Sequence, residues 1–94
     1  MANLNSKISI PKDVLFKDVG GEAVLLNLDT GQYYGLDEVG TRMWSLLSEH
    51  GQVEATYQEL LAEYDVDSGP LQADLLELVD ELAHHRLLRI DDSS

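Results

Sequence analysis

Hydrophobic and polar residues alternate along the first half of the chain with the period of two that is typical of β-strands. Three segments show this alternation, residues 14–19, 22–28 and 32–36, and glycine-bearing turns separate them. The Gly-Gly pair at 20–21 predicts a tight turn, and the Asp-Thr-Gly triplet at 29–31 predicts a three-residue loop. The pattern therefore predicts a meander of three antiparallel strands.

The two turns set the register of this meander. The first places Val19 opposite Glu22, and the second places Leu28 opposite Gln32. Because side chains alternate between the faces of a sheet, these registers assign the strand residues to two faces. The predicted core face carries Leu15, Val24, Leu26, Leu28, Tyr34 and Leu36. The predicted outer face carries Phe16, Leu25, Asn27 and Tyr33, and we expect Phe16, Leu25 and Tyr33 to form an exposed patch for docking a partner protein.

After the strands, the hydrophobic spacing changes to that of amphipathic helices. Asp37 is a predicted N-cap and Gly51 a predicted C-terminal cap of the first helix. A second helix is predicted at residues 53–64 and a third at residues 68–87, followed by a short closing strand or extended tail at 88–90. The fold class is therefore α+β, with a three-stranded antiparallel sheet packed on three helices.

The 94 residues are enough for one small domain with a single core. We expect residues 1–12 to be loosely ordered, residues 13–90 to form the domain and residues 91–94 to be a solvated acidic tail. The chain has no cysteine, and no window approaches the length of a membrane-spanning segment. It also lacks the features of a signal peptide, so we expect a cytoplasmic protein.

Acidic residues outnumber basic ones by 18 to 6, which gives a formal charge of −12. This charge repels phosphate backbones, and the basic residues are scattered, so nucleic acid is disfavoured as a partner. The charge favours a basic partner, or serves only solubility. No serine or carboxylate stands in a pattern typical of catalysis, so we expect no enzyme activity and no cofactor. His50, His84 and His85 lack the matched ligands of a metal site.

The third predicted helix carries more apolar surface than one packing interface needs. At 100° per residue its apolar positions span about 180°, whereas a helix packed on one side has a stripe of about 100°. These positions are Leu71, Leu75, Leu76, Leu78, Val79, Leu82, Ala83 and Leu87. Asp74, Glu77 and Glu81 form an acidic ridge beside them. The helix is therefore either a well-buried core helix or one wall of a groove with an acidic rim.

The third predicted strand, Gln32, Tyr33, Tyr34, Gly35 and Leu36, is an edge of the meander. It contains no Pro, Lys or Glu, the residues that usually prevent pairing at an edge. An extended peptide could therefore add to this edge and place alternate side chains against the third helix. The contact residues expected on that helix are Leu71, Asp74, Leu75, Glu77, Leu78, Glu81 and Leu82. Alternatively, residues 1–12 or a second copy of the chain covers the edge.

The central part of the sequence resembles a known family, the PqqD-like leader-peptide recognition elements of ribosomally synthesised and post-translationally modified peptides (RiPPs). The resemblance covers residues 14–90 and rests on a hydrophobic strand followed by the pattern D-T-G-x-Y-Y-x-L-x-E-V-G-x-x-x-W. The residues that carry it are Leu25 to Asp29, Thr30, Gly31, Tyr33 to Leu36, Glu38 to Gly40, Trp44, Leu47, Tyr64 to Val66, Leu87 and Leu88.

The resemblance implies a winged helix-turn-helix-like fold in which the leader of a precursor peptide adds as a strand between the third strand and the third helix. It also implies a standalone protein that delivers the leader to a leader protease in lasso-peptide biosynthesis, or to another modifying enzyme, with a Tyr-x-x-Pro element in the leader. Two alternatives stay open. One is a peptide chaperone for pyrroloquinoline quinone (PQQ) biosynthesis, and the other is a protein-interaction subunit that reads no peptide.

Overall fold

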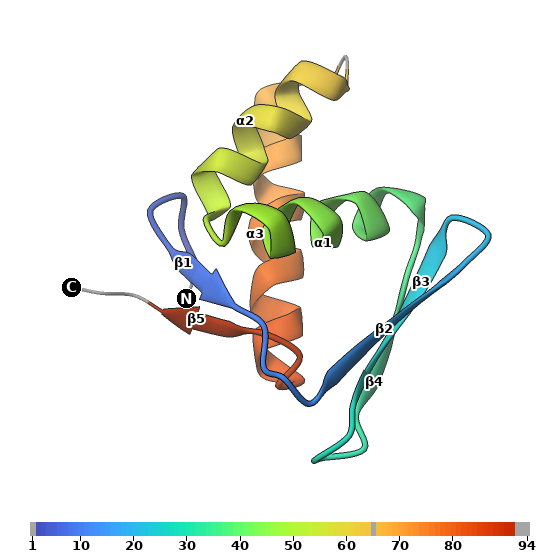
Figure 1. Cartoon of the computed structure of the whole chain (residues 1–94). Coiled ribbons are helices and arrows are strands. Elements are labelled where there is room, and N and C mark those ends of the chain that lie inside the picture. The colour runs from blue at the N-terminus through green and yellow to red at the C-terminus, as the bar shows by residue number, and fades with distance from the viewer. Residues whose placement is uncertain (1, 65, 92–94) are drawn as a thin grey trace.

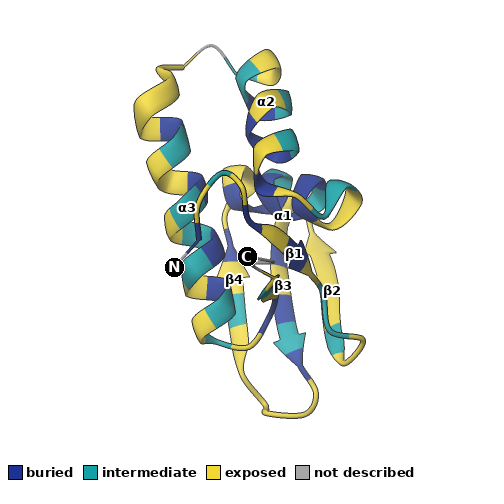
Figure 2. Ribbon diagram, turned by 90° about the vertical axis from the view of Figure 1, so that its left-hand side faces the viewer, coloured by how far each residue is buried: buried dark blue, intermediate teal, exposed yellow. Residues whose placement is uncertain are grey.

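The computed structural model describes residues 2–64 and 66–91 and has the predicted α+β, winged helix-turn-helix-like architecture (Figure 1). A three-stranded antiparallel sheet in the order β2-β3-β4 packs on three helices, and β1 and β5 form a separate two-stranded sheet. The elements are β1 (Lys7–Ser9), β2 (Val14–Val19), β3 (Glu22–Asn27), β4 (Tyr33–Leu36), α1 (Glu38–His50), α2 (Val53–Glu63), α3 (Ser68–His84) and β5 (Arg89–Asp91). Figure 2 shows α3 lying alongside β4, at one edge of the larger sheet.

The helices confirm the predicted boundaries closely. The Asp37 Oδ1 atom accepts a hydrogen bond of 2.7 Å from the Gly40 amide, which satisfies a donor in the first turn of α1. Gly51 ends α1 with a φ of 67°, a left-handed conformation that glycine adopts without a Cβ penalty. α3 ends at His84, a few residues before the predicted end, and the closing strand is β5.

The two turns of the meander differ in how well the sequence predicts them. The first has the predicted register, with Val19 opposite Glu22. The second register is wrong by one residue, because the Asn27 amide, rather than Leu28, faces Gln32 and donates a hydrogen bond of 2.8 Å to its carbonyl oxygen. The connecting loop therefore begins at Leu28 and is one residue longer than predicted.

The side chain of Asn27 explains the longer loop. Its Oδ1 atom accepts hydrogen bonds from the amides of Asp29 (2.8 Å) and Thr30 (3.1 Å). Its Nδ2 atom donates a hydrogen bond of 2.6 Å to the carbonyl oxygen of Arg86. These partners allow a polar side chain to be only 5% exposed. The predicted registers place Asn27 on the outer face. Its burial on the core face is the reason why the predicted register of the second turn is wrong.

A shift of one residue exchanges the faces of a strand, so the predicted faces of β3, and of β2 that pairs with it, are wrong. Leu25 is in the core with 0% exposure, and the predicted core-face residues that are exposed are Leu15, Val24 and Leu28. The predicted core-face residues that are at least partly buried are Leu26, Tyr34 and Leu36. The expected docking patch is therefore wrong as well, because Phe16 shares its face with the buried Leu25, while Tyr33 projects from the opposite face.

The N-terminal segment is part of the fold, which corrects the expectation that residues 1–12 are loosely ordered. β1 pairs with β5, and Ile8, opposite Ile90, is buried. The amide of Ala2 donates a hydrogen bond of 2.7 Å to Asp80 Oδ1 on α3. The described part of this segment therefore packs on β5, on α3 and near the α1–α2 turn, and none of its residues lines the groove described below.

The expected acidic tail, residues 91–94, is only partly described. Asp91 is the last residue of β5, and residues 92–94 lie outside the described residues. The described helices, α1 to α3, are each too short or too polar to cross a membrane.

Candidate peptide-binding groove

A groove runs between β4 and the exposed flank of α3, and we call it the β4–α3 groove. One part has a volume of about 350 Å³ and is lined by Tyr34 from β4 and by Asp74, Glu77, Leu78 and Glu81 from α3. The adjoining part has a volume of about 390 Å³. Its lining combines β4, the start of α1 and α3: Tyr34, Gly35, Leu36, Asp37, Val39, Gly40, Met43, Asp74 and Leu78. These two cavities lie between the strand and the helix that the sequence analysis named as the walls of a possible groove.

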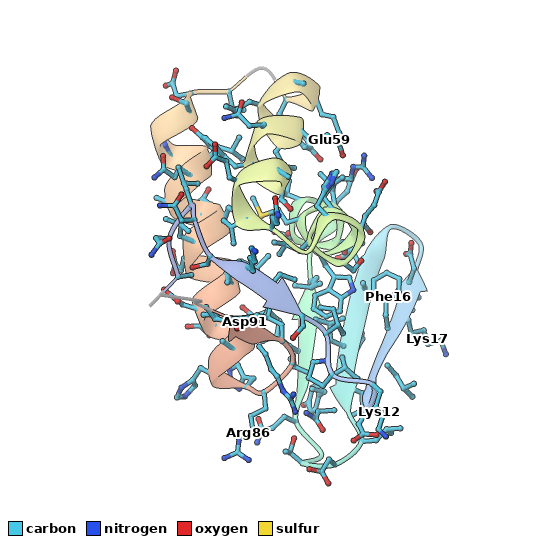
Figure 3. All side chains as sticks on the ribbon, turned by 60° about the vertical axis from the view of Figure 1, so that its left-hand side comes forward. Lys12, Phe16, Lys17, Glu59, Arg86 and Asp91 are labelled. Atoms are coloured by element: carbon cyan, nitrogen blue, oxygen red, sulfur yellow. The ribbon has the colours of Figure 1, made fainter. Side chains whose placement is uncertain are left out.

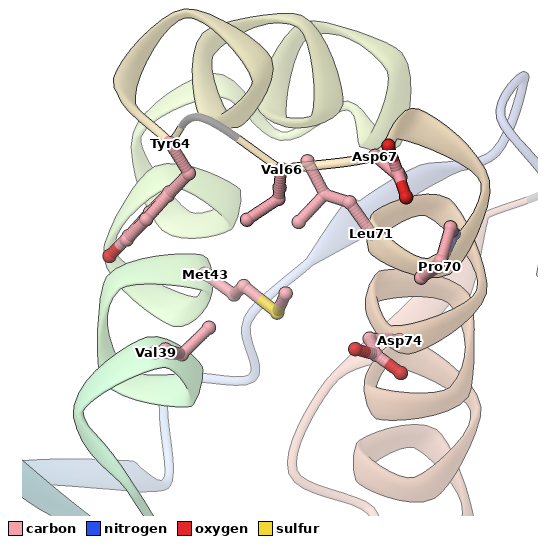
Figure 4. A pocket seen from close by; sticks show the side chains of 8 residues that line it. All are labelled: Val39, Met43, Tyr64, Val66, Asp67, Pro70, Leu71 and Asp74. Atoms are coloured by element: carbon pink, nitrogen blue, oxygen red, sulfur yellow. The ribbon is translucent and has the colours of Figure 1, made fainter.

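The groove continues into a larger cavity between α1 and the start of α3, which we call the helical pocket (Figure 4). Its volume is about 630 Å³. It is lined by Val39, Met43, Tyr64, Val66, Asp67, Pro70, Leu71 and Asp74. The lining is mostly apolar, and Figure 4 shows the carboxylates of Asp67 and Asp74 on the α3 side. Val39, Met43 and Asp74 line both cavities, so an extended ligand can pass from one to the other.

The edge of β4 that faces the groove has free backbone groups. Residues of an antiparallel strand alternate between bonding to one neighbour and facing the other side, and the carbonyl of Gln32 bonds to β3 through Asn27. Tyr34 therefore also bonds to β3, whereas Tyr33 and Gly35 direct their N–H and C=O groups outward. In residues 2–64 and 66–91, no strand pairs with this edge. A peptide strand can add there.

The floor of the groove is apolar and needs a glycine. Tyr34 and Leu36 point inward from β4, and the partly buried Leu78 faces them from α3. A Cβ atom at Gly40 would lie 3.1 Å from Asp37 Oδ1 and 3.3 Å from Leu36 Cδ2, so glycine allows α1 to start close to β4. Since alternate residues of an added strand point to the same side, residues i and i+2 of a peptide would reach the two parts of the groove.

The rim of the groove is acidic. Asp74, Glu77 and Glu81 are exposed along α3, as the sequence predicted. Among the described residues, Lys and Arg side chains form ion pairs only through Arg42, which lies on α1 and pairs with residues of α2. The negative charge of the ridge is therefore not compensated by a neighbouring Lys or Arg, and it favours a ligand with basic residues.

His85, at the end of α3, lies beside two residues that line the groove, Tyr34 and Glu81. Its ring centroid lies 5.6 Å from that of Tyr34, and its Nδ1 atom lies 3.3 Å from Gln32 Oε1. Its Nε2 atom lies 3.7 Å from Glu81 Oε2. His85 therefore connects the end of α3 to β4 and to the residue before it.

The family of the chain follows from its sequence as well as from this geometry. The family model described as "Coenzyme PQQ synthesis protein D (PqqD)" matches residues 22–88, which include all three helices, β3 and β4. The chain belongs to the PqqD family. The match confirms the resemblance to PqqD-like RiPP recognition elements that the D-T-G-x-Y-Y motif indicated. No curated protein matches the chain.

Two solved structures are similar to this PqqD-family domain. "TbiB1 in Complex with the TbiA(beta) Leader Peptide" is 38% identical, with a TM-score of 0.78 over 90% of this chain and 96% of that chain. "Lasso peptide synthetase B1 complexed with the leader peptide" is 19% identical, with a TM-score of 0.77 over 88% of this chain and 98% of that chain. The second likeness shows that the fold is shared.

The PqqD-family domain brings most of the predicted site residues together, with two corrections. Leu75 and Leu82 are fully buried in the core and cannot contact a peptide without unfolding of α3. Leu71 is also mostly buried but forms part of the wall of the helical pocket. The predicted residues that line the β4–α3 groove are Tyr34, Gly35, Leu36, Asp74, Glu77, Leu78 and Glu81. Of the remaining two, Tyr33 supplies edge backbone groups and Gln32 contacts His85.

Sequence reasoning missed the helical pocket. Val39 and Val66 are 43% and 53% exposed and line it, and neither is among the contact residues that the sequence predicted. A signal was present in the sequence, since Val39 lies in the first turn of α1, close after the edge strand β4. Val66 lies between two helices, and only the three-dimensional arrangement shows that it faces Met43.

A group of charged residues at the α1–α2 contact lies apart from the groove. Glu49, His50 and Glu59 bring ligand atoms within 4.8 Å of one another, so His50 has two carboxylate neighbours that the sequence did not indicate. The His50 Nε2 atom lies 3.5 Å from Glu59 Oε2, and Arg42 Nη2 approaches the same carboxylate at 3.9 Å. Surface acidic groups commonly gather in this way without an ion, and the arrangement serves to link α1 to α2.

Proposed function

We propose that this protein binds the leader segment of a ribosomally synthesised precursor peptide as an added strand on β4. The leader would pair with the outward backbone groups of Tyr33 and Gly35 and direct alternate side chains toward α3. The observation that carries this proposal is the free edge of β4 beside an apolar groove with an acidic rim. The likeness to a structure that is 38% identical and is described as a leader-peptide complex supports it.

We further propose that the bound leader is delivered to a separate processing enzyme in the cytoplasm, where ribosomal precursors are made. A leader protease of lasso-peptide biosynthesis is the partner that the sequence resemblance implies. The groove is lined by apolar and acidic side chains without a nucleophile next to a base, which supports a binding role rather than catalysis. A peptide chaperone for PQQ synthesis is the alternative that the description of the family favours.

Gly35 offers a sharp test of strand addition. Its N–H points outward, and no atom lies within 4 Å of a Cβ built at this position, so alanine fits there. Gly35→Pro removes the N–H that an added strand needs, whereas Gly35→Ala keeps it. We expect Gly35→Pro to weaken binding of a synthetic leader peptide at least about tenfold, since it removes a backbone hydrogen bond and obstructs its neighbours.

The matched Gly35→Ala variant should bind the leader within about twofold of the wild type, because it keeps the backbone N–H. Loss of that hydrogen bond would weaken binding by a larger factor. Circular dichroism and thermal unfolding establish that both variants fold. Equal leader affinity of two folded variants would contradict strand addition on β4. Comparing leaders of lasso-peptide and PQQ precursors by the same titration decides between the two pathways.

A further inference from the structure

The large hydrophobic side chains that stay exposed fall on two surfaces. Val39 and Val66 line the helical pocket. Within the described residues, the other six lie on the three-stranded sheet and its loop, and they are Leu15, Phe16, Val19, Val24, Leu28 and Tyr33. Contiguous exposed apolar surface of this kind marks interaction sites on soluble proteins. The groove accounts for the first surface, and the sheet requires a second explanation.

The registers place most of these sheet residues on one face, which we call the outer sheet face. Leu15 pairs with Leu26, and Leu26 pairs with Tyr33, so these three side chains form a row across the three strands. Leu15 is 51% and Tyr33 is 74% exposed. Val24 lies in the next row between Lys17 and Gly35. Figure 1 shows the three helices on the opposite side of this sheet, so no described helix covers the row.

We propose that the outer sheet face docks the processing enzyme, through an apolar patch of that enzyme that is flanked by carboxylates. This proposal rests on the proposed function, and it names the surface through which the held leader reaches its enzyme. It replaces the docking patch that the sequence predicted, because Leu25 of that patch is buried and Phe16 points to the core side.

Continuity with the groove favours the enzyme as the occupant. Tyr33 contributes its side chain to the outer sheet face and its backbone to the free edge of β4. A leader strand added to that edge would extend the same sheet, so the peptide leaves the groove next to this face. An enzyme docked there would meet the attached core peptide at high effective concentration.

Charge decides between this enzyme and a second copy of the chain. The outer sheet face carries Lys17 and, at its end, Glu22, so it is nearly neutral on a protein with a formal charge of −12. Two copies would bring together two strongly acidic molecules, and their repulsion opposes pairing through this face. Lys17, whose side chain points away from the helices (Figure 3), instead offers a contact for a carboxylate beside an apolar patch of a different protein.

The test uses the full chain, a synthetic leader peptide and the separately purified leader protease encoded with the precursor. Leu15→Glu places a charge at the β2 end of the row, and we expect it to weaken binding to the protease at least about tenfold, because a charge buried in an apolar interface without a partner is costly. Leader binding should stay within about twofold, because Leu15 lies on β2, away from the groove. Tyr33→Ser is a second variant that removes exposed apolar area with little effect on the core.

Phe16→Gln is the matched control. Phe16 neighbours Leu15 on β2 and is 44% exposed, but its side chain lies on the opposite face. It should leave both binding constants unchanged. The proposal is overturned if the wild-type chain does not bind the protease, or if folded Leu15→Glu and Tyr33→Ser bind it as the wild type does. It is also overturned if sedimentation shows a dimer that Leu15→Glu dissociates. If the wild-type chain does not bind the leader peptide, the proposed function is refuted instead.

Discussion

The side-chain amide of Asn27 donates a hydrogen bond of 2.6 Å to the carbonyl oxygen of Arg86, and so connects the loop after β3 to the end of α3. Arg86 has a φ of 59°, and the following amide, that of Leu87, bonds to the carbonyl of Leu82 at 2.8 Å. This is the geometry of a Schellman motif, in which the helix ends with one residue in the left-handed conformation. That residue is usually glycine, and here it is Arg86. The Asn27–Arg86 bond thus holds the β3–β4 hairpin against the helix that forms the other wall of the groove.

Replacing Asn27 with alanine should lower the free energy of unfolding by about 1–3 kcal/mol, since buried backbone groups lose their partner. Urea titration measures the change. Asn27→Asp is the informative comparison, because it keeps the oxygen acceptors for the loop but loses the donor to Arg86. If Asn27→Ala were as stable as the wild type, the Asn27–Arg86 hydrogen bond would make no contribution to stability.

Gly51→Ala should destabilise the protein by about 1–2 kcal/mol, because the left-handed conformation at the end of α1 brings an L side chain into steric conflict. Gly69→Ala provides the control in the first turn of α3. It has no positive φ and open space around it, and we expect it to be neutral or to add about 0.4–1 kcal/mol. The melting temperature should therefore fall for Gly51→Ala and stay the same or rise for Gly69→Ala, and equal decreases for both variants would contradict this assignment.

Stability should depend on pH through the ion pair of Arg42 and Glu63. The guanidinium donates hydrogen bonds of 2.8 and 2.7 Å to the carboxylate, and these lower the pKa of Glu63 and raise the pKa of Arg42. A lowered carboxyl pKa contributes stability that is present above the unfolded pKa and is lost as the pH falls through the folded pKa. The pair is exposed, so its effect is small and screened by salt.

Glu63→Gln should accordingly be less stable than the wild type at neutral pH, and the difference should vanish in acid as the carboxyl protonates. Denaturant titrations at a series of pH values measure this difference. Glu77→Gln, an exposed change in the middle of α3, serves as the control and should show no such pH-dependent gap. A gap for Glu63→Gln that persists in acid would point to a packing effect.

The acidic ridge should act mainly on the rate of leader association. Each exposed ion pair contributes only about 0.2–1 kcal/mol, so the summed charge appears chiefly as steering and salt dependence. We expect the triple variant Asp74→Asn, Glu77→Gln and Glu81→Gln to flatten the salt dependence of binding to a leader that carries Lys or Arg. Stopped-flow measurements over a range of ionic strength determine the slope.

The control for the ridge removes three exposed carboxylates elsewhere, Glu22, Glu49 and Glu54, and therefore makes the same change in net charge. It should change the slope much less than the ridge variant does. Equal slopes for both triple variants would assign the effect to the overall charge of the protein, and the ridge would then serve solubility.

Delivery by tethering makes a kinetic prediction. A tether raises the effective concentration of the substrate to about millimolar, so the processing enzyme should gain mainly in apparent KM at low precursor concentration, with little change in kcat. Assays with and without this protein over a range of precursor concentrations separate the two parameters. An increase in kcat that persists with a leaderless substrate would indicate activation of the enzyme instead.

Local rules predicted the helices and the first turn well because their signals are short in sequence. Asp37 and Gly51 cap α1 through contacts within a few residues, and the glycine pair before Glu22 fixes its turn alone. The exposed edge of β4 was also predictable, since its lack of charged and proline residues is visible in the sequence. These features located the groove.

Features that depend on distant partners were not predictable in this way. Asn27 is buried because the carbonyl of Arg86, 59 positions away in the sequence, accepts its hydrogen bond. Leu75 and Leu82 share their helix face with groove residues by sequence spacing, and only the packing of α3 shows that they are in the core. β1 is too short to be recognised without β5, which pairs with it.

The pairing of β1 with β5 joins the two ends of the described chain, with Lys7 opposite Asp91. The first and last strands of the domain therefore lie side by side, away from the free edge of β4. The domain should therefore tolerate insertion into a loop of a larger host protein, or joining of β5 to β1 with new ends opened elsewhere. A fusion made at β1 or β5 should leave the β4–α3 groove accessible, because neither strand lines it.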